Sequence, residues 1–114
     1  MSFVLVQELD SSQVESRLDS RGVLRFFSGY QIQELHVGSL RPGTVRGQHS
    51  HDYDEVLCIL GGAGFCQLEA WAEDGTQVNI PIQEEIKIFK VSAGVWHALR
   101  NTGDQTCYLL SFMC

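Results

Sequence analysis

The stretch Gly43-Thr-Val-Arg-Gly-Gln-His49-Ser-His51-Asp-Tyr-Asp-Glu55, which closes at Gly62, decides how this sequence is interpreted. It holds two imidazoles and one carboxylate, at His49, His51 and Glu55. Successive side chains of a strand alternate between its two faces, so residues separated by even numbers share a face. His49, His51 and Glu55 have this spacing, and a continuous strand would direct all three toward one point.

A second stretch, Gly94-Val-Trp-His97-Ala-Leu-Arg-Asn101, supplies a third imidazole from a distant part of the chain. Neutral imidazole and carboxylate are ligands for first-row transition metals such as Zn, Mn, Fe, Co and Ni. We therefore predict a divalent first-row transition metal held by His49, His51, Glu55 and His97, with open coordination positions for water or substrate. In the alternative reading no metal binds, and the histidines act as general acids or bases near neutral pH.

The composition limits the possible partners. A chain of 114 residues predicts a single domain spanning residues 1–114. The net charge of −6 and a pI near 5.0 argue against nucleic acid and anionic membranes as partners. The N-terminus has no basic start and only a short apolar run, so we expect neither a signal peptide nor a spanning helix and predict a cytoplasmic protein.

The chain contains four cysteines, Cys58, Cys66, Cys107 and Cys114. None of them forms a C-x-x-C motif, and no His/Asp pattern lies nearby to indicate catalysis. We expect reduced thiols, three of them on strands.

The sequence predicts β-structure almost throughout. Short apolar or alternating runs are separated by turn signals such as Arg41-Pro42-Gly43 and Asp74-Gly75, and no long helical period occurs. A turn of helix is expected only within Asp10–Leu18. About nine short strands indicate an all-β sandwich or barrel. The expected strands are Phe3–Gln7, Val23–Phe27, Tyr30–Leu40, Val56–Leu60, Phe65–Trp71, Thr76–Ile80, Ile86–Val91, Trp96–Arg100 and Thr106–Phe112.

With these residues in place, the chain resembles the cupin superfamily. The first cupin motif, G-x5-H-x-H-x3-4-E-x6-G, is matched over residues 43–62, and the second, G-x5-P-x-G-x2-H-x3-N, over residues 86–101. The second motif departs at Ile86 and Ser92, which replace its first Gly and its Pro. The resemblance implies a single-domain jelly-roll barrel with the four ligands named above, and a turn role for Asn101.

The activity of cupins varies widely, because the superfamily includes isomerases, epimerases, dioxygenases and sensors. The segment from Arg46 to His51 is similar to the R-G-x-H-x-H of sugar-nucleotide epimerases and ketoisomerases, and of the cupin domain of capsular-polysaccharide reductases. This resemblance implies an isomerase or epimerase acting on a sugar or another small polar carbonyl compound, with His49, His51 and Arg46 as catalytic candidates. Many such enzymes work without metal. The alternatives are an Fe-dependent dioxygenase and a non-enzymatic, small-molecule-sensing cupin.

Three further expectations concern residues outside the predicted site. Tyr53 lies at an odd offset from His51 and is expected to point away from the site. Trp96 is expected on the face of its strand opposite to His97. The apolar strand at Phe3–Gln7 is expected to pair with a second copy, which predicts a homodimer.

Overall fold

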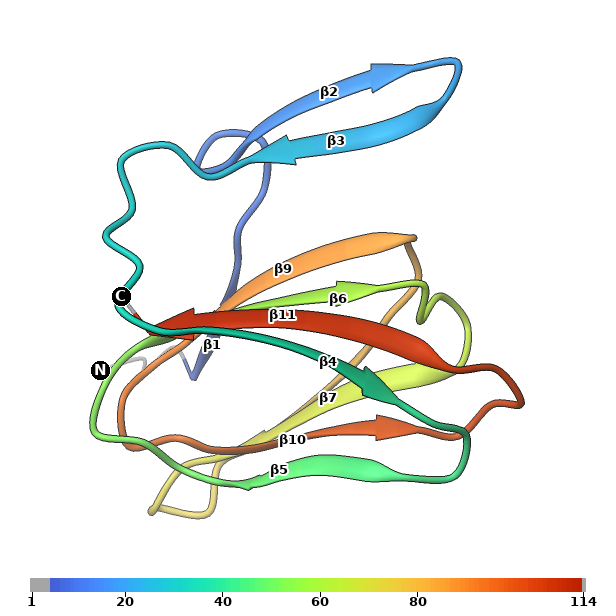
Figure 1. Cartoon of the computed structure of the whole chain (residues 1–114). Coiled ribbons are helices and arrows are strands. Elements are labelled where there is room, and N and C mark those ends of the chain that lie inside the picture. The colour runs from blue at the N-terminus through green and yellow to red at the C-terminus, as the bar shows by residue number, and fades with distance from the viewer. Residues whose placement is uncertain (1–4, 114) are drawn as a thin grey trace.

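The computed structural model describes residues 5–113 and consists of β-strands, turns and loops over that range (Figure 1). One antiparallel sheet has the strand order β1-β9-β6-β11-β4, and a second has the order β5-β10-β7-β8. The strands β2 and β3 form a separate hairpin. The bounds are β1 Val6–Glu8, β2 Glu15–Asp19, β3 Gly22–Phe26, β4 Leu35–Leu40, β5 Val45–His49, β6 Glu55–Leu60, β7 Cys66–Trp71, β8 Gln77–Pro81, β9 Ile86–Val91, β10 Trp96–Asn101 and β11 Cys107–Met113.

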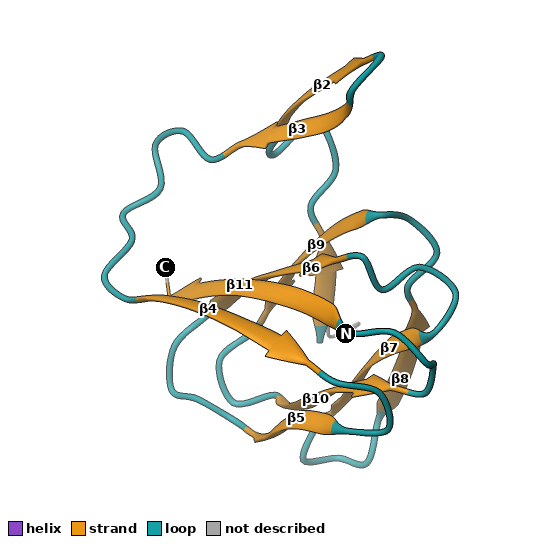
Figure 2. Cartoon of the chain, turned by 45° about the vertical axis from the view of Figure 1, so that its right-hand side comes forward, coloured by secondary structure: helices purple, strands orange, loops and turns teal. Residues whose placement is uncertain are grey.

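From β4 onward the chain passes between the two sheets at almost every turn, with β7 and β8 as the one consecutive pair inside a single sheet. The sheets face each other in Figure 2, so residues far apart in sequence meet across the interior. This arrangement confirms the predicted all-β cupin fold. Residues 5–113 contain no helix of the length and apolarity that crossing a membrane requires.

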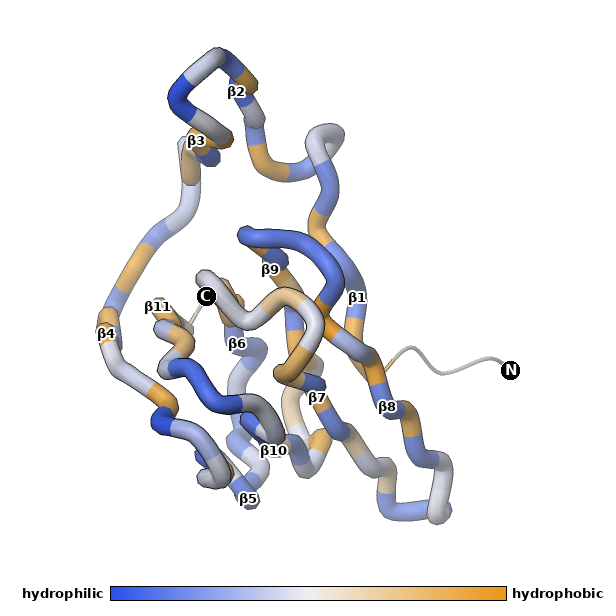
Figure 3. Tube along the Cα trace, turned by 90° about the vertical axis from the view of Figure 1, so that its right-hand side faces the viewer, coloured by the Kyte–Doolittle hydropathy of each residue, from blue (hydrophilic) through white to orange (hydrophobic). Residues whose placement is uncertain are grey.

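The core lies between the two sheets. Leu57, Ile59 and Phe89 from the five-stranded sheet pack against Leu68 and Leu99 from the four-stranded sheet. Each of these side chains is almost completely buried, and burying one Leu, Ile or Phe stabilises the fold by about 1.5–3 kcal/mol. Figure 3 shows hydrophobic and hydrophilic positions interleaved along the chain.

Several predicted boundaries shift in the structure. The strand expected over Tyr30–Leu40 begins only at Leu35, because residues 27–34 connect the hairpin to the sheet without ladder pairing. The predicted helical turn is limited to Asp10–Val14, where the amide of Val14 donates to the carbonyl of Asp10, and the chain then becomes β2. β1 begins at Val6, while part of the predicted Phe3–Gln7 strand lies outside the described residues.

The β2–β3 hairpin projects from the two sheets (Figures 1 and 2). All five residues of β2 are exposed, and Leu18 and Leu24 are 78% and 58% exposed. Arg25 of β3 connects the hairpin to the preceding segment, because one of its Nη atoms donates to the carbonyls of Leu9 and Val14. Apolar side chains of the hairpin are therefore left in solvent.

Candidate metal and substrate site

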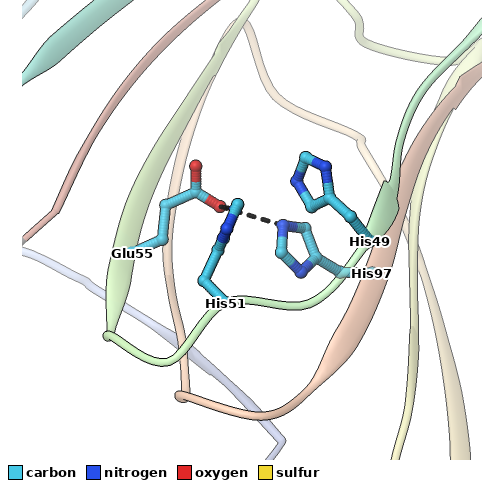
Figure 4. A group of neighbouring side chains, drawn as sticks. All are labelled: His49, His51, Glu55 and His97. Carbon is cyan, nitrogen blue, oxygen red and sulfur yellow. Dashed lines mark ion pairs between the residues drawn. The ribbon is translucent and has the colours of Figure 1, made fainter.

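The segment between His49 and Glu55 does not form the continuous strand that the even spacing implied. β5 ends at His49 in the four-stranded sheet, and β6 begins at Glu55 in the five-stranded sheet. Residues 50–54 form the loop that crosses from one sheet to the other, carrying His51. The prediction of a shared strand face is thus wrong, yet the crossing loop still brings these three side chains together (Figure 4).

A β-bulge in β5 directs His49 inward. Leu99 of β10 pairs with Arg46, Ala98 pairs with Gly47, and His97 pairs with His49, so one residue of β5 is extra. The extra step falls at Gly47 and Gln48, whose φ angles are +96° and +57°. Without it, Arg46 and His49 would point to opposite faces, because they are an odd number of residues apart.

The four predicted ligands converge. His49, His51, Glu55 and His97 each offer one donor atom, and these atoms all lie within 4.8 Å of one another. Nε2 of His97 is 2.9 Å from Oε1 of Glu55, and Nε2 of His51 is 3.9 Å from the same oxygen. The ring centroids of His49 and His51 are 4.2 Å apart. His97 and Glu55 are buried, His51 is half-buried, and His49 is the most exposed of the four.

The tautomer of His97 follows from its neighbours. Its Nδ1 lies 3.0 Å from the carbonyl oxygen of Val95, which can only accept, so Nδ1 carries a proton. In the neutral ring, Nε2 then presents a lone pair toward Glu55. A carbonyl partner on the far nitrogen is the usual way in which a metal-ligating histidine is oriented.

Oε1 of Glu55 is buried and has no aligned hydrogen-bond donor, although His97 is within 3 Å of it. A buried carboxylate oxygen without a donor is costly unless a positive charge compensates it. The compensating charge is either a proton on His97 or a cation between the four side chains. The donor set, three imidazoles and one carboxylate, therefore fits a divalent first-row metal.

The three clearly shifted groups of the cluster respond to the same surroundings. Burial, followed by the charges of His51 and His97, lowers the pKa of His49. The pKa of His97 is raised. Burial by itself would lower it, but the contacts of the ring with Glu55 and with the Val95 carbonyl outweigh burial. Burial raises the pKa of Glu55, but the short contact with His97 and the charge of His51 overcome it and lower this pKa.

The cluster lines a cavity of about 310 Å³ that lies between the two sheets. Its wall includes Arg46 and Ser111 together with the apolar side chains of Leu57, Leu99 and Leu109. Nε of Arg46 donates to the carbonyl of Ser39 at 2.8 Å, which anchors the side chain at the cavity rim. The structure thus brings the predicted catalytic candidate Arg46 into the same cavity as the four predicted ligands.

Sequence reasoning placed some neighbours correctly and missed others. Tyr53 does not point away from the site, because it lies on a loop: its ring stacks on that of His51, with centroids 4.6 Å apart and planes 10° apart. Trp96 lies on the face of β10 opposite to that of His97, as expected, and its ring packs edge-on against the ring of Trp71. Ser111 was missed, and its one signal is that it interrupts the apolar run of β11.

Asn101 has the expected turn role. Its side-chain Nδ2 donates to the backbone carbonyls of Leu40 and Gln105, and its side-chain Oδ1 accepts from the backbone amide of Gly103. The residue therefore holds the loop after β10 in place at the end of the molecule away from the histidines.

The two facing sheets and the four side chains that converge between them have the arrangement of a cupin fold. No family model matches the sequence, and no curated protein matches it. Among solved structures, the chain is similar to a variant of the 3,4-ketoisomerase QdtA from Thermoanaerobacterium thermosaccharolyticum, in complex with TDP-4-keto-6-deoxyglucose. That match has a TM-score of 0.75 and 15% identity, and it covers 98% of this chain and 81% of the other.

Two other solved structures share the fold. WlaRA from Campylobacter jejuni, a TDP-fucose-3,4-ketoisomerase, matches with a TM-score of 0.71 and 14% identity, over 97% of this chain and 82% of that one. The capsular polysaccharide assembling protein CapF from Staphylococcus aureus matches with a TM-score of 0.62 and 16% identity, over 88% of this chain and 28% of that one. These TM-scores show that the proteins share a fold.

Proposed function

We propose that this protein is an isomerase or epimerase acting on a carbonyl sugar, and that a sugar nucleotide is its substrate class. The observation that carries the proposal is the convergence of His49, His51, Glu55 and His97 within 4.8 Å at the wall of one cavity. Isomerisation beside a carbonyl requires moving a proton between adjacent carbons, for which imidazole is suited near neutral pH. The similarity in fold to 3,4-ketoisomerases supports the same reaction class.

The cavity supports a substrate of limited size. A volume of about 310 Å³ lies near the lower end of the range of small-molecule sites. It suits a single sugar ring, with any nucleotide extending outward past the rim. Arg46 stands at that rim, and its guanidinium is the group in the cavity wall best able to bind a phosphate or carboxylate.

His49, His51, Glu55 and His97 would hold a divalent first-row metal in this proposal. When bound, such an ion polarises a substrate carbonyl. The orphaned Oε1 of Glu55 and the fixed tautomer of His97 support metal binding. If the protein works without metal, His49 and His51 become the proton carriers, and the lowered pKa of His49 supports that role, since it leaves the ring neutral and able to accept a proton.

The test uses TDP-4-keto-6-deoxyglucose with the wild-type protein in D2O, followed by NMR. We expect deuterium to enter at the carbon beside the carbonyl and a second keto isomer to accumulate. The His49→Ala/His51→Ala variant is expected to lose both signals. Oxygen consumption without isomerisation would favour the dioxygenase, and saturable binding without either reaction would favour the sensing protein.

Metal dependence is tested separately by elemental analysis of protein purified without an affinity tag or chelator. Near-stoichiometric Zn, Mn, Fe or Ni, lost in the double variant, is the expected result. Absence of metal in both proteins after reloading would contradict the metal site and leave the metal-free isomerase.

A homodimer is also part of the proposal. Val6 and Gln7, from the strand expected to pair with a second copy, lie in β1 at one edge of the five-stranded sheet, next to β9. β4 is the other edge strand, and Leu35 and Val37 on it are 51% and 75% exposed. The hairpin adds Leu18 and Leu24 to the exposed apolar surface, and pairing with a second copy is a common way to cover such edges. Light scattering is expected to give twice the chain mass, and a monomer at micromolar concentration would contradict this.

A further inference from the structure

Two cysteines lie against each other in the core. Cys66 begins β7 in the four-stranded sheet, and Cys107 begins β11 in the five-stranded sheet. Their Sγ atoms are 3.0 Å apart, and both residues are buried, at 3% and 0% exposure. The pair therefore spans the interior between two strands that do not pair with each other.

The pair lies at the end of the molecule opposite to the histidine cluster. Along the β7–β10 ladder, Cys66 is opposite Asn101, whereas His97 is opposite Ala70 near the other end of both strands. Cys107 is opposite Leu40, at the end of β4, and is likewise remote from Glu55. Neither cysteine lines the cavity.

We propose that Cys66 and Cys107 form a disulfide that links the two sheets at this end. The sulfur atoms need to approach by only about 1 Å to reach the bonded distance of about 2.05 Å. Two thiols lose two protons and two electrons as the bond forms. A small-molecule disulfide such as oxidised glutathione takes up the electrons, first as a mixed disulfide with one cysteine, and is released as two reduced thiols.

Access determines when the bond forms. Burial, together with the neighbouring Cys107, raises the pKa of Cys66 to about 12, so the closed fold contains little thiolate. The two turns that precede the cysteines are joined by a hydrogen bond from the amide of Thr102 to the carbonyl of Phe65. Opening of this end, or folding in the presence of oxidant, exposes both thiols at once. Oxidation is therefore expected to be slow in the folded protein and efficient during refolding.

Cys58 supplies a matched control. It is buried, and burial raises its pKa to about 12 as well, so its accessibility and acidity resemble those of Cys66. It belongs to a different core cluster, with Val56, Ile88 and Phe112, which contains no other cysteine among its buried residues. Burial alone thus does not distinguish the pair; the sulfur–sulfur contact does.

The experiment refolds a Cys58→Ala/Cys114→Ser variant, which retains only the pair, in a buffer of reduced and oxidised glutathione. We expect intact mass to fall by two hydrogen atoms and the Tm to rise by roughly 10 °C relative to the reduced sample, reversibly on adding a phosphine. A Cys66→Ala/Cys107→Ala variant should show neither change. Glutathione adducts or two free thiols after refolding would overturn the proposal.

The wild-type chain provides a second readout that does not depend on the variant's folding. After refolding in the same buffer, free thiols are alkylated under denaturing conditions and the protein is digested and mapped by mass spectrometry. Linked peptides containing Cys66 and Cys107, with alkylated Cys58, are expected. Alkylation of Cys66 and Cys107 to the same extent as Cys58 would refute the link.

Discussion

Nε2 of His97 lies 2.9 Å from Oε1 of Glu55 across the two sheets, while the other ring nitrogen is committed to the carbonyl of Val95. His97 is the second residue of β10 in one sheet, and Glu55 is the first residue of β6 in the opposite sheet. Because the far nitrogen carries the single proton of the neutral ring, this contact is stable only with a positive charge between the two atoms, either a second proton on His97 or a metal ion. Most of the expected behaviour of the site follows from that requirement.

Removing the charge of Glu55 is expected to weaken metal retention. Glu55→Gln keeps the size of the side chain but removes the one anionic donor among the four, so metal affinity should fall roughly 10-fold or more. The measurement is metal content by elemental analysis after dialysis against a weak chelator. Glu69→Gln is the control, since Glu69 is also buried but pairs with Arg100 at 3.1 Å rather than with a histidine. Equal metal content in both variants would exclude Glu55 from the ligands.

Arg46→Ala tests the substrate side of the cavity without touching the four ligands. KM for an anionic substrate should rise roughly 10-fold, as expected for loss of a charge-assisted contact, while metal content stays unchanged. Arg17→Ala removes an exposed cation on the distant hairpin and serves as the control. A wild-type KM in the Arg46 variant would remove the main residue-level support for an anionic substrate.

Much of this site was predictable, because the sequence spacing of the histidines and Glu55 identifies them even though the backbone between them is irregular. The H-x-H…E pattern and the distant His97 identified four side chains that do meet. The reason assigned to their meeting was wrong, since a crossing loop and a bulge, not one straight strand, bring them together. A period-two argument assumes an unbroken strand, and a bulge changes the parity of every residue beyond it.

Other features were not predictable from spacing. The stacking of Tyr53 on His51 depends on the path of an irregular loop, for which alternation carries no information. The missed strand β2 is polar and exposed on both faces, so it has no apolar period to identify it. The contact between Cys66 and Cys107 joins strands of different sheets, and only the three-dimensional packing brings them together.

The pH dependence of stability is expected to change sign with metal. In the metal-free protein the pKa of His97 is raised above its ordinary 6.5, so its stabilising effect is complete below 6.5 and is lost as pH rises through the raised value. The pKa of His49 is lowered below 6.5, so this residue adds stability as pH rises toward 6.5 and contributes no decline at higher pH. The metal-free protein should therefore lose stability as pH rises above about neutrality.

With metal bound, the ion replaces the proton on His97, and metal affinity increases with pH as competing protons are lost. The metal-loaded protein should therefore gain stability over the same range. Urea unfolding at several pH values, with and without chelator, measures both slopes. The metal-free His97→Gln variant should lose the decline above 6.5, whereas His49→Gln should retain it. A decline of equal size in all metal-free proteins would assign it to another group.

At the lower end of the pH range, Glu55 is expected to set the limit. Its pKa is lowered below the ordinary 4.5, so its stabilising effect is present above 4.5 and is lost as pH falls through the folded value. Acid unfolding of the metal-free protein should therefore be less steep in Glu55→Gln than in the wild type. An unchanged acid limb in that variant would show that other carboxylates dominate.

Gly47 is expected to be the most sensitive residue of the bulge. A Cβ at this position would lie 2.9 Å from the carbonyl oxygen of His97, and the φ of +96° is itself unfavourable for a side chain. Gly47→Ala should therefore cost about 1–3 kcal/mol in the free energy of unfolding and displace His49 from the other ligands, with a loss of metal. Gly75→Ala is the matched control, because its φ of +90° imposes the same kind of strain but no atom lies within 4 Å of its Cβ. If the two variants lose equal stability and both retain metal, the close approach of β5 to β10 is not what aligns His49.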